Sequence, residues 1–370
     1  MRVLMQSRKT LFSVPGGDTV HITGNAKKLR ELGVKVDIST ELNPDLSNYD
    51  IVHIFNLVRP QEVYLQALNA KKQGKPLALS PIYVSWEEYE KYGSDGLRKL
   101  LANILPYHSI EYLKIMARAV INKESHKGVI SVLLNGYFGL MKKIVDLTDI
   151  FFPNSEMEME KLVDDFKLKN PFYQIVPNGI DVSLFDYEKV KIIDENAMKV
   201  KDSILCVGNI AGNKNQLNLV RAMKELPYKL FLIGNVSPNH HGYFQKIKKE
   251  MGDNVFFLGK VAHEQLAQYY KAAKVHVLPS WFETTGRVSL EAAAMKCNIV
   301  ITDKGFTKAY FGDYAFYCDP QDIGSIKKAI TEAFETPFNE KLLKHIMMNF
   351  TRDIAAQKTL EGYEKLLSKI

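Results

Sequence analysis

Residues 275–302 of the chain read VHVLPSWFETTGRVSLEAAAMKCNIVIT. Two short apolar runs, Val275–Leu278 and 299–302, flank a stretch whose apolar residues recur at helical spacing. A strand, a loop, a helix and a second strand in this order form a unit whose two strands run parallel, because the helix carries the chain back to the starting edge. The stretch therefore indicates an α/β fold built on a parallel sheet.

The same alternation extends in both directions from this stretch. Short apolar runs separated by helical segments are typical of doubly wound sheets, so we expect two Rossmann-like doubly wound domains that face each other across a cleft. The turn Pro177-Asn178-Gly179 divides them into domains 1–178 and 179–355, and the polar stretch 181–200 is predicted to be a linker. The remaining expected strands are 2–5, 34–38, 51–55, 76–80, 150–152, 175–177, 204–207, 230–233 and 255–258.

Composition and missing motifs narrow the function. The 370 residues carry a net charge of +7, which favours anionic ligands without requiring nucleic acid. No G-x-G, phosphate-loop, HExxH or Cys/His metal pattern occurs, so we expect no metal site and no cofactor. Three cysteines fit no disulfide framework and are expected in the core. Without a signal-peptide pattern at 1–10, the protein is expected to be cytoplasmic.

A basic region at 98–143 suggests a second kind of partner. It holds eight Lys or Arg residues against Glu111 and Glu124, and it contains the uncharged apolar stretch 128–141, which is too short to cross a bilayer alone. Helices with apolar faces and basic flanks can lie on an anionic membrane surface. The alternative is a pair of core helices with solvated ends.

Two glutamates near the start of the quoted helix are the strongest site candidates. Glu283 and Glu291 form E-x7-E, and if both were near-helical they would be separated by about 12 Å of rise, which suits one elongated ligand. The backbone amides of Thr284, Thr285 and Gly286 would then lie at a helix N-terminus, where anions or sugar hydroxyls bind. The alternative is a capped, solvated helix start.

In this context the segment resembles the signature of the retaining nucleotide-sugar glycosyltransferases of GT-B family 4 (glycosyl transferases group 1). The resemblance implies that Glu283 contacts the donor sugar and that Glu291 binds the ribose hydroxyls. The family's diphosphate-binding Arg-x4-Lys loop is similar to 208–214, where Lys214 matches and Asn209 replaces the arginine. The resemblance extends over nearly the whole chain and implies a last helix, 356–370, that packs back on the first domain.

Other positions agree with the family or depart from it. Gly16 and Gly17 match its N-terminal glycine-rich loop, whose amides approach a phosphate or an acceptor. Thr284 and Thr285 change the sugar pocket, and Arg287 could supply the charge lost at Asn209. No histidine follows the strand ending at residue 80, so Tyr83 or Ser85 could line the site, unless they belong to a packed loop. His21 and His53 are interpreted as structural, and His240 and His241 as loop residues.

The resemblance implies a retaining transfer of a hexose from a UDP- or GDP-sugar to an alcohol acceptor. Catalysis would rest on Lys214 and Glu283. The other donor-binding residues would be Gly16, Gly17, Asn209, Thr284, Thr285, Gly286, Arg287 and Glu291. The acceptor would be a saccharide or a lipid-linked saccharide in surface-polysaccharide or glycolipid synthesis. An inactive nucleotide-sugar-binding or scaffold protein of the same fold, and a nucleotide-sugar epimerase, stay open as alternatives.

Overall fold

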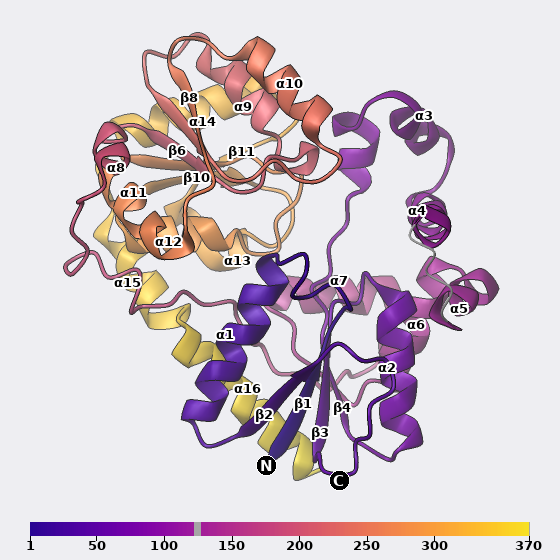
Figure 1. Ribbon diagram of the computed structural model, residues 1–370. Coiled ribbons are helices and arrows are strands. Elements are labelled where there is room, and N and C mark those ends of the chain that lie inside the picture. The colour runs from indigo at the N-terminus through magenta and orange to yellow at the C-terminus, as the bar shows by residue number, and fades with distance from the viewer. Residues whose placement is uncertain (122–126, 370) are drawn as a thin grey trace. The chain divides into compact units, whose positions relative to one another are not determined.

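The structure is a computed structural model that describes residues 1–121 and 127–369 and is shown in Figure 1. The chain divides into two compact units, each built around one parallel sheet. Unit 1 comprises Met1–Val84, Leu101–Asn178 and Arg352–Ile370. Unit 2 comprises Ser85–Leu100 and Gly179–Thr351. The segment Ser85–Leu100 thus belongs to the second unit although it lies early in the chain.

The sheet of unit 1 has five parallel strands in the order β2-β1-β3-β4-β5. The strand order reverses between β1 and β3, so the loops that follow these two strands leave the same edge of the sheet side by side. The strands are β1 (Arg2–Gln6), β2 (Lys35–Ser39), β3 (Ile51–Phe55), β4 (Leu77–Ser80) and β5 (Ile150–Phe151).

Helices cover both faces of this sheet (Figure 1). Alternate residues of a strand point to opposite faces of the sheet, so they pack into two separate cores. Val3 and Met5 pack with α1 (Gly17–Glu31) and α16 (Arg352–Leu367). Leu4 packs with the cluster of α2 (Pro60–Lys72) and α6 (Tyr137–Leu147) on the other face. The last helix of the chain is therefore part of unit 1.

The basic region forms a run of helices beside the sheet. They are α3 (Gly96–Ile104), α4 (Tyr107–Ile121), α5 (Lys127–Asn135) and α6, and α7 (Glu156–Phe166) follows β5. Lys123 and Glu124 of this region lie outside the described residues. Among the described helices none is by itself long and apolar enough to span a bilayer, whereas α5 and α6 reach the length and composition together but bend by 108° at their junction.

The sheet of unit 2 has six parallel strands in the order β11-β10-β9-β6-β7-β8. Here the order reverses between β6 and β9, which pair directly. Loops after these two strands must therefore lie next to each other. The strands are β6 (Ile204–Val207), β7 (Leu230–Ile233), β8 (Val255–Gly259), β9 (Val275–Leu278), β10 (Asn298–Thr302) and β11 (Phe316–Cys318).

The helices of unit 2 also form two layers. One core cluster joins the sheet to α9 (Gln216–Met223), α10 (His241–Glu250) and α14 (Ile323–Glu335). The other joins it to α8 (Glu195–Lys199), α11 (Leu266–Ala272), α12 (Arg287–Ala294), α13 (Lys308–Phe311) and α15 (Glu340–Asn349). Cys206, Cys297 and Cys318 are buried free thiols, which confirms their prediction as core residues.

Two expectations about local structure were wrong, and one strand was not predicted. Residues 175–177 form no strand: the chain makes one isolated bridge at Tyr173, because Pro171 and Pro177 lack the N–H that a longer ladder needs. Stretch 181–200 is not a free linker, since Phe185 and Val200 are buried in unit 2. The strand β11 was not predicted, because it is only three residues long and half-buried.

Candidate functional site

The loop after β6 contains the predicted diphosphate-binding residues. A Cβ on Gly234 would lie 2.0 Å from the carbonyl oxygen of Gly208, so the ends of β6 and β7 approach at backbone distance and only glycine fits. Gln216, at the start of α9, donates from Nε2 to the carbonyl of Asn209 at 2.9 Å and fixes the start of the loop. The Asn209 side chain itself is exposed.

Lys214 ends this loop and pairs with Glu283 of the loop after β9. The Nζ to Oε1 distance is 2.5 Å, and the two side chains are 27% and 11% exposed. A second bond joins the loops, because the Trp281 amide donates to the carbonyl of Asn213 at 3.0 Å. The structure thus brings together the two residues predicted to be catalytic, and it does so at the reversal of strand order.

The backbone around Glu283 is held by the loop after β10. The Glu283 amide donates to the carbonyl of Lys304, and its own carbonyl accepts from the Phe306 amide at 2.9 Å. A Cβ on Gly305 would lie 2.1 Å from the Glu283 carbonyl oxygen, so this close approach depends on glycine. These bonds fix the direction in which the carboxylate points, and they come from a segment that sequence analysis did not single out.

Glu291 lies on α12 and is buried, with 4% of its surface exposed. His263 Nε2 is 2.9 Å from Oε1, and the Tyr270 hydroxyl donates to Oε2 at 3.4 Å. Burial, followed by the charge of Glu291, raises the pKa of Tyr270 well above its usual value, so this hydroxyl keeps its proton. Neither partner was predicted, because His263 and Tyr270 belong to no local motif around Glu291.

The two glutamates do not share one helix. Glu283 forms an isolated bridge with Gly305, and α12 begins only at Arg287, so the 12 Å rise expected for E-x7-E does not apply. The helix starts late because Gly286 takes a left-handed conformation (φ 73°) at its N-cap. Thr284 and Thr285 therefore precede the helix, with Thr285 buried and Thr284 half-buried, while Arg287 is half-buried in the first turn.

The segment Ser85–Leu100 of unit 2 packs against this loop pair. Tyr89, in a π-helical turn (Tyr89–Gly93), lies so close to Gly212 that a Cβ there would be 2.3 Å from the tyrosine hydroxyl. Gly93 is equally tight against the Trp281 ring, and Trp86 meets Phe282 edge-to-face. Sequence analysis missed this contact, since nothing local links Tyr89 to a loop more than a hundred residues away.

His240 also touches the diphosphate loop. Its Nδ1 accepts from the Gly212 amide at 3.2 Å, and burial together with the charge of Arg98 lowers its pKa. A neutral imidazole is what accepting this hydrogen bond requires. His240, predicted to be a solvated loop residue, is instead a support of the loop that ends at Lys214.

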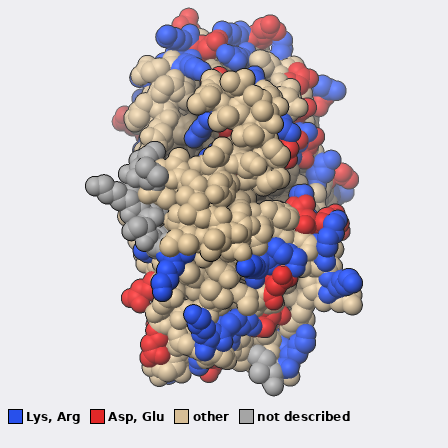
Figure 2. All heavy atoms as spheres, turned by 90° about the vertical axis from the view of Figure 1, so that its right-hand side faces the viewer, with Lys and Arg blue, Asp and Glu red and all other residues tan. Residues whose placement is uncertain are grey.

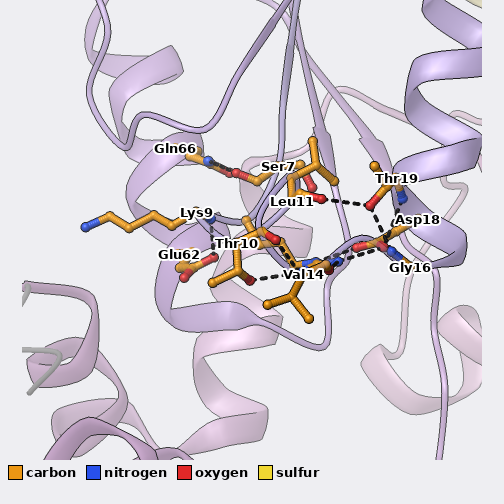
Figure 3. A network of polar contacts seen from close by, with 11 residues as sticks. Ser7, Lys9, Thr10, Leu11, Val14, Gly16, Asp18, Thr19, Glu62 and Gln66 are labelled. Carbon is orange, nitrogen blue, oxygen red and sulfur yellow. Dashed lines mark hydrogen bonds and ion pairs between the residues drawn. The ribbon is translucent and has the colours of Figure 1, made fainter. Parts of the chain in front are cut away.

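The other predicted donor-binding loop lies in unit 1. Gly16 precedes α1, and its amide donates to Thr19 Oγ1 at 3.0 Å (Figure 3). Arg8 donates from Nε to Asp18 at 2.6 Å. Burial raises the pKa of Asp18, but this bond and the arginine charge outweigh it and hold the pKa below its usual value. A Cβ on Gly17 would meet no atom within 4 Å, so Gly17 leaves open space beside the backbone.

Other candidates in unit 1 are engaged in internal contacts. The Tyr83 hydroxyl donates to Asp165 at 2.8 Å, as in the packed-loop alternative. His53 is fully buried between the Tyr363 hydroxyl (2.6 Å) and Ser80 Oγ (2.9 Å), and burial lowers its pKa well below its usual value. Within 1–121 and 127–369, no group of three or more His, Cys, Asp or Glu side chains could hold a metal ion.

With this geometry in place, comparisons with known proteins show which family part of the chain resembles. Residues 189–349 match the family model "Glycosyl transferases group 1". A mannosylfructose-phosphate synthase of Agrobacterium fabrum is 26% identical over 348 residues, which are 83% of this chain and 76% of that protein. The matched region 189–349, which contains Lys214, Glu283 and Glu291, is thus similar to the glycosyl transferases group 1.

Further comparisons concern one relative and one solved structure. An N-acetylgalactosamine-N,N'-diacetylbacillosaminyl-diphospho-undecaprenol 4-alpha-N-acetylgalactosaminyltransferase of Campylobacter jejuni is 27% identical over 221 residues, 55% of this chain and 58% of that protein. HepE of Anabaena, solved in complex with UDP, superposes with a TM-score of 0.68 at 14% identity, covering 99% of this chain and 100% of that one. The two doubly wound sheets are those of the GT-B fold.

Proposed function

We propose that this protein is a group 1 glycosyltransferase and that it acts as a retaining, metal-independent hexosyltransferase. Its donor is a UDP- or GDP-sugar, and its acceptor is the hydroxyl of a saccharide or of a lipid-linked saccharide. The domain 179–355 binds the donor, and the domain 1–178, with the C-terminal helix 356–370, binds the acceptor. No cofactor takes part.

The ion pair of Lys214 with Glu283 carries this proposal. It lies where the strand order of unit 2 reverses, and ligands of doubly wound sheets bind outside the carboxyl ends of the strands at such points. A diphosphate would compete with the carboxylate for the Lys214 ammonium, and Glu283 would then be free to accept hydrogen bonds from sugar hydroxyls. Glu291, which is buried on α12, would accept hydrogen bonds from the ribose hydroxyls in place of its present partners His263 and Tyr270.

The reaction needs few protein groups. The bond between the anomeric carbon and the diphosphate oxygen breaks, and the acceptor oxygen forms the new bond on the same face. The acceptor's proton passes to the departing diphosphate, so no protein base is required. Catalysis then depends on stabilising the negative charge of the leaving group and on positioning. Lys214 supplies the charge, and backbone amides at Gly17 and 284–286, with Arg287, supply further donors, whereas the Gly16 amide would first have to leave Thr19 Oγ1.

The surface of α4, α5 and α6 in unit 1 supports an acceptor that lies at a membrane. The described residues 101–121 and 127–147 hold five Lys or Arg and two Asp or Glu residues, and large apolar side chains are exposed among them. Such a surface suits the inner face of an anionic membrane, where each basic residue near the surface contributes roughly 1 kcal/mol. The Campylobacter relative, whose name includes diphospho-undecaprenol, supports a lipid-linked acceptor.

A thermal-shift screen of UDP-, GDP-, ADP- and dTDP-sugars, each in EDTA, tests the donor part of the proposal. A ligand at 100 times its Kd stabilises the folded state by about 2.7 kcal/mol, which raises the melting temperature measurably. We expect one nucleotide class to shift the melt in EDTA. No shift with any donor, for protein shown to be folded, would overturn a nucleotide-sugar function.

Transfer assays with the donor so identified separate the remaining alternatives. Donor binding followed by sugar transfer to saccharide or lipid-linked acceptors supports the hexosyltransferase. Donor binding with no turnover across those acceptors identifies an inactive binding or scaffold protein. Conversion of the donor to its epimer without any acceptor identifies an epimerase. The anomeric configuration of the product, read by NMR, tests retention.

A further inference from the structure

An open apolar cavity lies among the helices of unit 1, away from the loops described above. Its volume is about 390 Å³, within the range of small-molecule sites. It is lined by Leu105, His108, Ser109, Tyr112 and Leu113, which lie in and just before α4, and by Gly136 and Tyr137 at the start of α6. Sequence analysis did not predict it, because it arises only from the way these helices pack.

The break between α5 and α6 creates this space. Gly136 has a positive φ of 70°, which favours glycine, and the two helices diverge by 108° around it. A straight helix through this point would leave no recess at the junction. Tyr137 lines the cavity and is buried, and its hydroxyl donates to the Val58 carbonyl at 3.4 Å. This bond holds one of the lining side chains in place.

The surroundings of the cavity are apolar and solvent-exposed. Single exposed leucines need no explanation, but several on neighbouring helices mark an interaction surface. Figure 2 shows the corresponding side of the molecule as a broad uncharged area with both basic and acidic side chains around it. The large apolar side chains exposed on α3 to α6 of unit 1 are Ile104 (68%), Leu113 (45%), Ile130 (55%), Leu133 (50%), Leu134 (80%) and Phe138 (38%).

The charges around this surface are mainly positive. Lys127 begins α5 and Lys143 lies in α6, and both are exposed. Lys114 and Lys142 pair with the only two acidic side chains of the described 101–121 and 127–147 stretches, Glu111 and Asp146. The remaining basic residues leave a positive excess next to the apolar surface, which attracts a molecule that is both anionic and apolar.

We propose that the α4/α6 cavity binds the hydrocarbon chain of an anionic lipid, with the headgroup at the basic border. An open, apolar recess surrounded by exposed leucines fits a chain that enters from a membrane, and the positive border fits a phosphate headgroup. A protein partner would gain little from this recess without a side chain matched to it. The identification of this lipid as the glycosyl acceptor rests on the proposed function. The binding site for the hydrocarbon chain does not depend on that function.

Fluorescence of cis-parinaric acid, an anionic fatty acid whose emission rises in an apolar site, tests the cavity in the intact protein. We expect saturable uptake that lysophosphatidylglycerol displaces and that glycerol phosphate, which has no chain, does not. Ser109→Trp places a large ring in the cavity and should weaken uptake at least about tenfold, since each excluded methylene costs about 0.8 kcal/mol. His108→Trp fills the same space from an exposed position and serves as a second variant.

Ser368→Trp, at an exposed serine near the end of the chain, is the matched control and should leave uptake unchanged. Circular dichroism and thermal melting establish that each variant folds. The proposal is overturned if parinarate does not bind, if glycerol phosphate displaces it as well as the lysolipid does, or if both filled variants bind it normally. These readouts involve no sugar transfer, so a failure of the proposed transferase activity would leave them unaffected.

Discussion

Lys214 and Glu283 are 69 positions apart in the chain, yet their side chains lie 2.5 Å apart. An ammonium group so placed can pass from a carboxylate to a diphosphate without a large movement, because both are anionic acceptors. Such an exchange would leave Glu283 available to sugar hydroxyls only when the donor is present. Under the proposed function, the pair would couple donor binding to the exposure of the carboxylate.

We expect Lys214→Ala to lower kcat by 10²- to 10³-fold, as the loss of one well-aimed donor does. The variant should still fold, because Lys214 is at the loop end and 27% of its side chain is exposed. Steady-state kinetics with the donor identified by thermal shift measure the effect. Lys328→Ala, at a lysine whose side chain is 78% exposed on α14, is the control. A normal kcat in Lys214→Ala would remove this lysine from catalysis.

The contact between Tyr89 and Gly212 gives a second test at the residue scale. Gly212→Ala would place a Cβ 2.3 Å from the Tyr89 hydroxyl, and overpacking of this kind typically lowers the free energy of unfolding by about 1–3 kcal/mol. Tyr89→Phe removes that hydroxyl, so the double variant should recover part of the loss. Denaturant unfolding of the four proteins measures the coupling. Strictly additive effects would mean that the two residues do not touch.

At the scale of elements, α7 supports the loop that follows β4. Glu158 lies in the first turn of α7 and accepts from the amides of Tyr83 and Asn154, each at 2.6 Å. It is fully buried, and burial raises its pKa from 4.5 to about 7 in spite of these two bonds. A helix start thus holds a neighbouring loop through one carboxyl group whose protonation changes near neutral pH.

The raised pKa predicts how stability depends on pH. The folded protein keeps the Glu158 proton to a higher pH than the unfolded chain does, so this group stabilises the fold fully below about pH 4.5. Its contribution should decline as pH rises to about 7, by on the order of 3 kcal/mol in all. Urea unfolding of the wild type and of Glu158→Gln across this range measures the difference.

The substitution should flatten the slope of unfolding free energy against pH. Glu160→Gln, at an exposed glutamate two residues along the same helix, should not. If Glu158→Gln keeps the wild-type slope, the carboxyl does not titrate in this range and the argument about α7 fails.

At the scale of the whole molecule, a net charge of +7 and the exposed apolar side chains of α4 to α6 predict membrane adsorption. We expect co-sedimentation with phosphatidylglycerol-containing vesicles at low salt, weaker binding at high salt, and none with phosphatidylcholine alone. Leu134→Asp should reduce binding, because Leu134 is 80% exposed on α5. Leu32→Asp, at a leucine 44% exposed after α1, is the matched control. Equal binding by both variants would place the adsorbing surface elsewhere.

Much of the fold could be predicted because strands and helices have characteristic patterns of apolar residues along the chain. Runs such as 204–207 and 230–233 match β6 and β7, since buried strands of a parallel sheet are apolar over their whole length. The exceptions have physical causes. Stretch 175–177 has the apolar pattern of a strand, but a ladder needs N–H donors that Pro171 and Pro177 lack. Stretch 181–200 is polar overall, so the few side chains in it that pack into unit 2 could not be recognised from composition.

Some features of the candidate site could likewise be predicted from the sequence, and others only from the tertiary structure. The sequence by itself determined the α/β class and singled out Glu283 and Glu291, because a helix start is read from neighbouring residues. Lys214 followed only from the resemblance to a known family. Only the tertiary structure decided that Lys214 meets Glu283, that His263 and Tyr270 hold Glu291, and that Tyr89 supports the loop. The physical reason is strand order: β6 lies beside β9, and no local pattern records which strands become neighbours.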